Sequence, residues 1–164
     1  MRYLLALLLV AGCSTKPTEQ GEADSALPAY PVAARLVEFE ERNGGDFRFY
    51  IDAATLAVDK DGVVRYVLVA RSASGVQNVT YEGLRCDTAE YRFYAFGRAD
   101  GTWSRSRSDW RSLQLAPPLQ RVLFADYFCP QKVAILNAAE GVRALRAGGH
   151  PFTTGGSGDM GRGQ

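Results

Sequence analysis

The chain has 164 residues, with 19 basic side chains, 18 acidic side chains and one histidine. This length suits one domain with its own hydrophobic core. A formal charge of +1 argues against the general attraction to nucleic acid or anionic membranes that strongly basic proteins show, so we expect no nucleic-acid partner.

The first thirteen residues have the layout of a bacterial lipoprotein signal. Arg2 is followed by an apolar run that leads into Val10-Ala11-Gly12-Cys13. A secretory signal combines a cationic start, an apolar stretch of roughly 7–15 residues and small residues before the cleavage site. A membrane span would need about 20 apolar residues. We therefore expect residues 1–12 to be removed and Cys13 to carry a lipid.

The residue after Cys13 bears on the location of the protein. Ser14 stands where an aspartate would favour retention in the inner membrane. We therefore expect a lipid-anchored protein on the periplasmic face of the outer membrane, with the inner membrane as the alternative. Residues 13–31 are rich in proline and polar side chains, which is typical of a flexible tether.

The next part of the chain is mostly strand. Turn sequences such as Asp61-Gly62 and Asp100-Gly101 separate the apolar runs, and short turns predict an antiparallel meander. Both alternating faces of residues 63–71 are apolar, which indicates a central strand with a cover on its second face, for which we expect a helix. The predicted strands are 47–52, 56–58, 63–71, 76–85, 91–96 and 102–103.

Two helices are predicted near the C-terminus. Residues 118–127 have apolar side chains at near-helical spacing, and Asn137 and Glu140 have the arrangement of a capping box at the start of residues 137–147. The glycine-rich residues 148–164 predict a disordered tail. We expect one α+β domain over residues 32–147, an antiparallel sheet with short C-terminal helices packed on or beside it.

Cys86 and Cys129 remain once Cys13 is assigned to the lipid. In the oxidising compartment to which an exported chain is sent, two remaining cysteines indicate a disulfide. A reactive thiol pair or two metal ligands are the alternatives, although neither a CxxC spacing nor a nearby histidine supports them. The bond would join the end of strand 76–85 to the end of helix 118–127.

The segment over residues 103–111 combines tryptophan with arginine. These residue types dominate interaction hot spots, because they offer large flat surfaces and bidentate hydrogen bonds. The segment is therefore a candidate contact for an envelope protein or a glycan. The alternative is a loop at the end of the sheet, in which the tryptophans fill the core and the arginines face water. The residues concerned are Trp103, Arg105, Arg107, Trp110 and Arg111.

No catalytic residue, metal site or cofactor is predicted. His150 is the only histidine and lies in the glycine-rich tail, where it could hardly be held as a base beside a nucleophile. The acidic run Glu38-Phe39-Glu40-Glu41 is interpreted as a solvated helix start, and Asp59-Lys60-Asp61 as a turn. A hydrolase built on carboxylates would need two of them facing each other in a cleft.

Three ordered runs resemble those of a known family. They are Tyr81-Glu82-Gly83-Leu84-Arg85-Cys86, Asp100-Gly101-Thr102-Trp103 and Tyr127-Phe128-Cys129-Pro130. Over about residues 35–147 the chain resembles the family named after the cryptic neisserial protein, which comprises small exported proteins, often lipoproteins, of beta-proteobacteria. The resemblance implies one domain with no assigned activity, cofactor or catalytic residue. It also implies Asn and His before the aromatic helix, in the region Leu115 to Leu123, where this chain has Pro117, Pro118, Gln120 and Arg121 instead.

These features leave three hypotheses for the function. The one we favour is a non-enzymatic lipoprotein that binds or supports another component of the cell envelope. The second is a small-ligand or glycan-binding module that uses Arg105, Arg107, Arg111 and exposed tryptophans. The third is a hydrolase that uses carboxylates alone.

Overall fold

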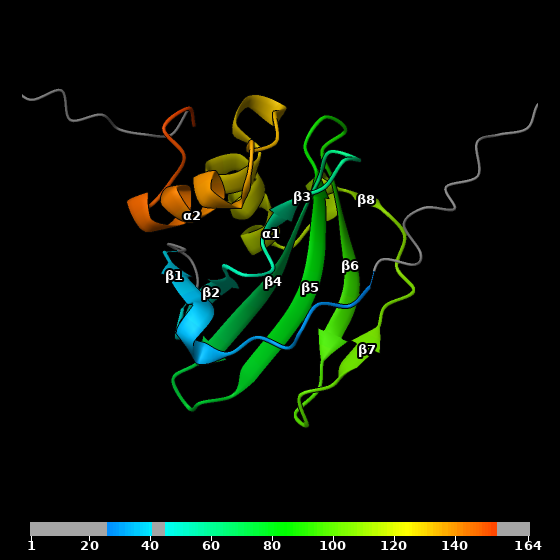
Figure 1. Cartoon of the computed structure of the whole chain (residues 1–164), viewed down its shortest axis with the longest axis vertical. Coiled ribbons are helices and arrows are strands. Elements are labelled where there is room, and N and C mark those ends of the chain that lie inside the picture. Colours follow the sequence, from blue (N-terminus) through cyan, green and yellow to red (C-terminus); the bar gives the residue numbers. More distant parts are fainter. Residues whose placement is uncertain (1–25, 41–44, 154–164) are drawn as a thin grey trace, which may run out of the picture.

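The computed structural model describes residues 26–40 and 45–153, and within them the chain forms an antiparallel sheet with helices at its C-terminal end (Figure 1). The α+β class predicted from the sequence is confirmed. The strands are β1 (Leu36–Phe39), β2 (Phe47–Asp52), β3 (Ala57–Val58), β4 (Val63–Ser72), β5 (Gln77–Arg85), β6 (Glu90–Gly97), β7 (Trp103–Arg105) and β8 (Arg111–Ser112).

The strands follow one another as the predicted meander. Their order in the sheet is β1-β2-β4-β5-β6-β7, while β3 pairs with β4 and β8 pairs with β6. Gly62 and Gly101 have φ angles of 76° and 79°, a left-handed conformation that glycine adopts at little cost. Both lie in turns that the sequence predicts.

Strand β1 corrects the expectation of a helix start at Glu38. Residues Leu36–Phe39 pair with β2, with Phe39 opposite Phe49, and Phe39 is buried. Such pairing depends on a partner further along the chain, so the local acidic run gives a misleading signal.

The helical part follows the strands. Asn137 accepts a hydrogen bond from the Glu140 amide at 3.1 Å, as the capping pattern predicts. Residues 118–128 form one α-helical turn that continues as a π-helix, in which the Cys129 amide donates to the Phe124 carbonyl at 2.9 Å. The helical elements are η1 (Ala33–Arg35), η2 (Leu113–Leu115), α1 (Pro118–Val122), η3 (Leu123–Phe128), η4 (Pro130–Lys132) and α2 (Ala138–Ala147).

The helices cover one face of the sheet, which we call the helical face. Val64, Tyr66 and Leu68 of β4 share a buried cluster there with Phe128 of η3 and Leu145 of α2. Burying such side chains stabilises the fold by about 1.5–3 kcal/mol each, so this cluster is the main core of the domain.

The opposite face is covered by an extended segment, residues 26–32, and by two tryptophans, whereas a helix was expected there. Leu27 and Tyr30 pack with Trp103 and Trp110 over buried side chains of β4, β5 and β6. In Figure 1 this N-terminal segment crosses in front of β5 and β4. Residues 26–31, assigned from their composition to a flexible tether, thus lie against the sheet, and we call this face the N-terminal face.

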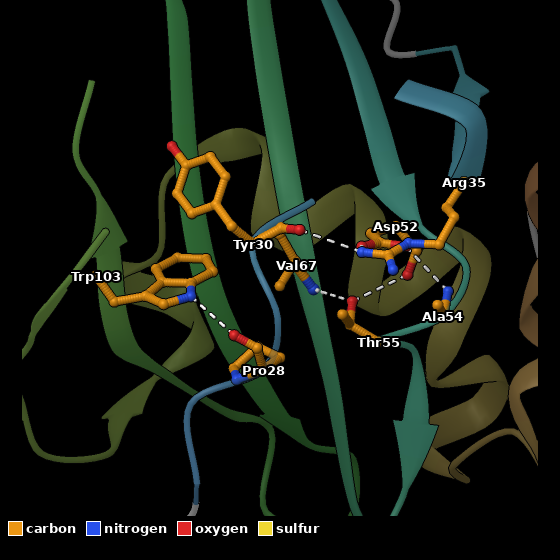
Figure 2. Close-up of polar contacts among 8 residues, drawn as sticks. All are labelled: Pro28, Tyr30, Arg35, Asp52, Ala54, Thr55, Val67 and Trp103. Carbon is orange, nitrogen blue, oxygen red and sulfur yellow. Dashed lines mark hydrogen bonds and ion pairs between the residues drawn. The ribbon is translucent and has the colours of Figure 1, made fainter. Parts of the chain in front are cut away.

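Specific hydrogen bonds hold the N-terminal segment in place (Figure 2). The indole Nε1 of Trp103 donates to the Pro28 carbonyl at 2.9 Å. The Tyr30 hydroxyl donates to the Arg98 carbonyl, which the figure does not include, at 3.0 Å. At the other end, Arg35 donates to the Tyr30 carbonyl at 3.2 Å and binds Asp52. The segment is therefore fixed at both edges of the face that it covers.

Candidate functional site at the edge of the sheet

The Trp103–Arg111 segment leaves β6 at one end and returns to it at the other. Arg105 in β7 stands opposite Ala95, and Arg111 in β8 stands opposite Tyr91. Between them the Ser106 amide donates to the Tyr94 carbonyl and the Ser108 hydroxyl donates to the Phe93 carbonyl, each at 2.8 Å. The serines thus hold the connecting loop against the part of β6 that neither strand covers.

The two tryptophans pack on the N-terminal face. The Trp103 ring centroid lies 5.2 Å from that of Tyr30 and 6.5 Å from that of Tyr81. Trp110 packs edge-on against Tyr94 at 6.3 Å, and both tryptophans are half-buried. A binding platform of exposed tryptophans is therefore not formed, and the interpretation that they fill the sheet core fits the structure.

A bulge in β6 places Tyr94 on the same face. The β5–β6 register shifts between Tyr81 and Glu82, so that Tyr94 is an additional residue between two paired positions. Its ring lies over Gly83, where an added Cβ would come within 2.8 Å of the ring. Arg65 and Arg92 lie 5.4 and 5.2 Å from the Tyr94 ring centroid, which is within the range of cation–π attraction.

The arginines of the segment lie at the surface. Arg105, Arg107 and Arg111 are all exposed. Within residues 26–40 and 45–153, Arg107 and Arg111 take part in no ion pair. Their guanidinium groups are thus available to a ligand.

A depression of about 210 Å³ lies between β6 and the segment. The rings of Phe93 and Phe96 are stacked in it with a centroid distance of 5.5 Å, and Tyr91 packs edge-on against Phe93 at 5.7 Å. Phe96 is 45% exposed although it is a large apolar side chain. The remaining lining residues are Arg92, Ser106, Ser108, Asp109 and Arg111.

Sequence reasoning found only part of this site. Of the five residues singled out, Arg111 lines the depression, whereas the tryptophans lie on the N-terminal face and Arg105 and Arg107 lie outside the lining. Phe93 and Phe96 belong to the predicted strand 91–96 and were not singled out as site residues. The alternation Tyr91-Arg92-Phe93 placed two aromatic residues on one face, but the bulge at Tyr94 decides where Phe96 lies.

Three of the carboxylates considered for a hydrolase, Glu38, Asp59 and Asp61, are engaged in ion pairs. Glu41 lies outside the described residues. Asp59 and Asp61 each bind the buried Arg65 at 2.6 Å. The hydrogen bond from Arg65 holds the pKa of Asp61 below its ordinary value. Glu38 pairs with Arg48 at 3.2 Å on the surface. These contacts assign the carboxylates structural roles.

Glu82 is a buried carboxylate that the sequence analysis did not single out. It lies on the helical face, where the Tyr66 hydroxyl donates to it at 3.0 Å and the Gln120 amide at 3.1 and 3.2 Å. Thr80 also donates to it. Burial raises the pKa of Glu82 although all three groups donate to the carboxylate. Gln120, at the place where the family resemblance implies other residues, thus joins α1 to the sheet.

Replacing Glu82 by Gln is expected to change how stability depends on pH. The folded carboxyl group keeps its proton to a higher pH than the unfolded one, whose pKa is about 4.3. Wild type therefore loses stability as the pH rises from that value through the raised pKa of Glu82. The difference in unfolding free energy, wild type minus Glu82→Gln, should fall over this window in urea denaturation.

Glu38→Gln is the matched control, since Glu38 is exposed in a surface ion pair. It should follow the wild-type pH dependence closely. If Glu82→Gln also follows it, the buried carboxyl group does not titrate as described.

His150 lies in the folded domain, contrary to its assignment to a disordered tail. It is 4% exposed, and its amide donates to the Asp126 carbonyl. Nδ1 accepts from the Phe152 amide at 3.3 Å, so the ring hydrogen lies on Nε2 and is donated to Glu140 at 3.0 Å. That bond, with one from the Leu136 amide, lowers the pKa of Glu140. His150 thus fixes the chain after α2.

The disulfide joins Cys86 to Cys129, and its Cα atoms are 5.2 Å apart. Cys86 follows β5 and Cys129 follows η3, so the bond fastens the helical part to the sheet as predicted. Both cysteines are buried. Cys13 lies outside the described residues.

Within residues 26–40 and 45–153, no group of three His, Cys, Asp or Glu side chains is placed to hold a metal ion. No helix in those ranges has the length and apolar character needed to cross a bilayer.

The sequence pattern of the CNP1-like family matches residues 15–146. The chain belongs to this family. The match covers the N-terminal segment, all eight described strands, both disulfide cysteines and most of α2. The resemblance found from the three sequence runs is therefore confirmed for this CNP1-like chain. No curated protein and no solved structure matches it.

Proposed function

We propose that this CNP1-like protein is a non-enzymatic binding module, anchored by a lipid on Cys13 to the periplasmic face of the outer membrane. It binds or supports another envelope component through the edge of the sheet. The observation that carries this proposal is the depression with stacked phenylalanines beside Arg111, whose guanidinium has no ion-pair partner within the described ranges. Exposed aromatic and arginine side chains are typical of contact surfaces.

The N-terminal segment supports the same arrangement. Pro28 is held by Trp103, so the chain enters the domain beside β7, next to the exposed arginines. Twelve residues lie between Cys13 and Ala26, and the chain between these two residues can span at most about 45 Å. The proposed anchor therefore keeps the sheet edge within that distance of the membrane surface.

Lipidation of Cys13 is the first test. Mass spectrometry of the membrane fraction should find a mature chain that begins at Cys13 and carries acyl chains. Cys13→Ala should release the protein from membranes, because the attachment needs this thiol. Separation of the two membranes distinguishes the outer from the inner location. A chain that retains Met1, or a Cys13→Ala protein that stays with membranes, would contradict the proposal.

The exposed arginines provide the second test. Arg105→Ala with Arg107→Ala should leave the unfolding free energy within about 0.5 kcal/mol of wild type, because both side chains are exposed. The same double variant should lose most of the envelope material that crosslinks to the wild-type protein in cells. Arg143→Ala with Arg146→Ala is the control, since these arginines lie exposed on α2. Equal crosslinking by both double variants would exclude Arg105 and Arg107 from the contact.

A further inference from the structure

We infer that the depression beside β6 binds a single acidic sugar ring, such as a terminal uronic acid of a glycan. This inference deepens the proposed function and rests on it, because it names the ligand class of the same sheet edge. It is carried by the size of the depression, its apolar floor and the polar side chains around it.

The size limits the ligand to about one ring. The depression measures about 210 Å³, below the about 300–1,000 Å³ of pockets that hold drug-sized molecules. It is also open to solvent along the edge of β6, where Phe96 is 45% exposed. One terminal residue of a longer saccharide can enter while the remainder stays in water.

The floor suits the face of a sugar. Phe93 and Phe96 both line the depression, and their rings are stacked at 5.5 Å with an interplanar angle of 27°. The face of an aromatic ring is its negative side, and it attracts the weakly positive C–H groups on one face of a pyranose. Contact with a sugar would also cover the exposed part of Phe96.

The polar lining supplies both kinds of hydrogen-bonding group. Asp109 and the Ser108 hydroxyl can accept from sugar hydroxyls, and Arg111 can donate to a carboxylate through two parallel N–H groups. Among the lining residues, Arg92 and Arg111 carry positive charges and Asp109 carries the one negative charge. This excess of positive charge favours an acidic sugar over a neutral one.

The test is a titration of the full-length, isotope-labelled protein with glucuronate and with glucose, followed by amide chemical shifts. Glucuronate should shift the amides of β6 and residues 106–111 with a Kd on the order of 1 mM, the affinity of a ligand of this size at ordinary efficiency. Glucose should bind several-fold more weakly, because it has no carboxylate to form a charge-assisted hydrogen bond with Arg111.

Two variants separate the contributions of the floor and the guanidinium. Phe96→Ala should raise the Kd of both sugars about fivefold, because it removes one of the two stacked rings. Arg111→Gln should raise the Kd of glucuronate about fivefold and leave the Kd of glucose nearly unchanged. Phe47→Ala is the matched control, since Phe47 is 41% exposed and stacks on Phe49 in β2, which β4 and β5 separate from β6. It should bind both sugars as wild type does.

The outcomes decide the inference independently of the anchor. If neither sugar shifts the amides of β6, or if both variants bind as wild type does, the sugar site is excluded. Equal affinity for glucose and glucuronate excludes the preference for acidic sugars. The titration needs no lipid, so it remains valid if Cys13 is not acylated, and a negative titration leaves the lipidation and crosslinking tests unaffected.

Discussion

Removing the disulfide between Cys86 and Cys129 is expected to lower the free energy of unfolding by about 2–4 kcal/mol. The bond closes a loop of 43 residues that includes β6, the whole Trp103–Arg111 segment and η3. Without it the unfolded chain gains conformational freedom, and the helical part loses its covalent link to the sheet. The measurement is urea denaturation of oxidised and reduced protein.

The double variant Cys86→Ala with Cys129→Ala controls for the reductant. It should be about as stable as reduced wild type, and the reductant should not change it further. Lipidation should continue in this variant, because the anchor uses a different cysteine. Equal stability of oxidised and reduced wild type would show that the bond contributes nothing measurable to the fold.

The sequence predicts those parts of the fold that depend on local patterns. Strand β2 begins and ends where its apolar run does, and the turns at Gly62 and Gly101 adopt the left-handed conformation that such turns need. Helix α2 begins at the Asn137 cap and ends at Gly148 in the same conformation. In each case neighbouring residues decide the structure.

Features that depend on distant partners could not be predicted in this way. The N-terminal segment has the composition of a tether, and it is ordered by bonds from Trp103, 75 residues away, and to Arg98, 68 residues away. His150 lies in a glycine-rich run, yet Asp126 and Glu140 hold it in the fold. Composition reports the average tendency of a segment to order and contains no information about such contacts.

The candidate site was misplaced for a related reason. Alternation along a strand assigns side chains to faces only while the register is regular, and the bulge at Tyr94 breaks the register in β6. The tryptophans lie on the N-terminal face, and phenylalanines line the depression. The sequence analysis named Arg111 correctly, because its place in the lining requires only that it be exposed at the end of the segment.

The N-terminal segment also provides the second large expected effect. Arg35→Met should lower the free energy of unfolding by about 3 kcal/mol, the lower end of the range for breaking a buried ion pair. Asp52 is fully buried. Arg35 Nε donates to one of its carboxylate oxygens at 3.1 Å, and Arg35 Nη2 donates to the other at 2.9 Å. Of the donors to this carboxylate that Figure 2 draws, the variant leaves only the Ala54 amide, at 3.0 Å. The lower end applies because Arg35 is 34% exposed.

Arg48→Met is the matched control for that variant. Arg48 pairs with Glu38 at 3.2 Å, but both side chains are largely exposed, and such pairs contribute about 0–1 kcal/mol. Arg35 also holds the Tyr30 carbonyl, so Arg35→Met should speed hydrogen exchange and proteolysis of residues 26–35, whereas Arg48→Met should not. If the two variants are equally stable and equally protected, the Arg35–Asp52 pair does not fix the N-terminal segment to the sheet.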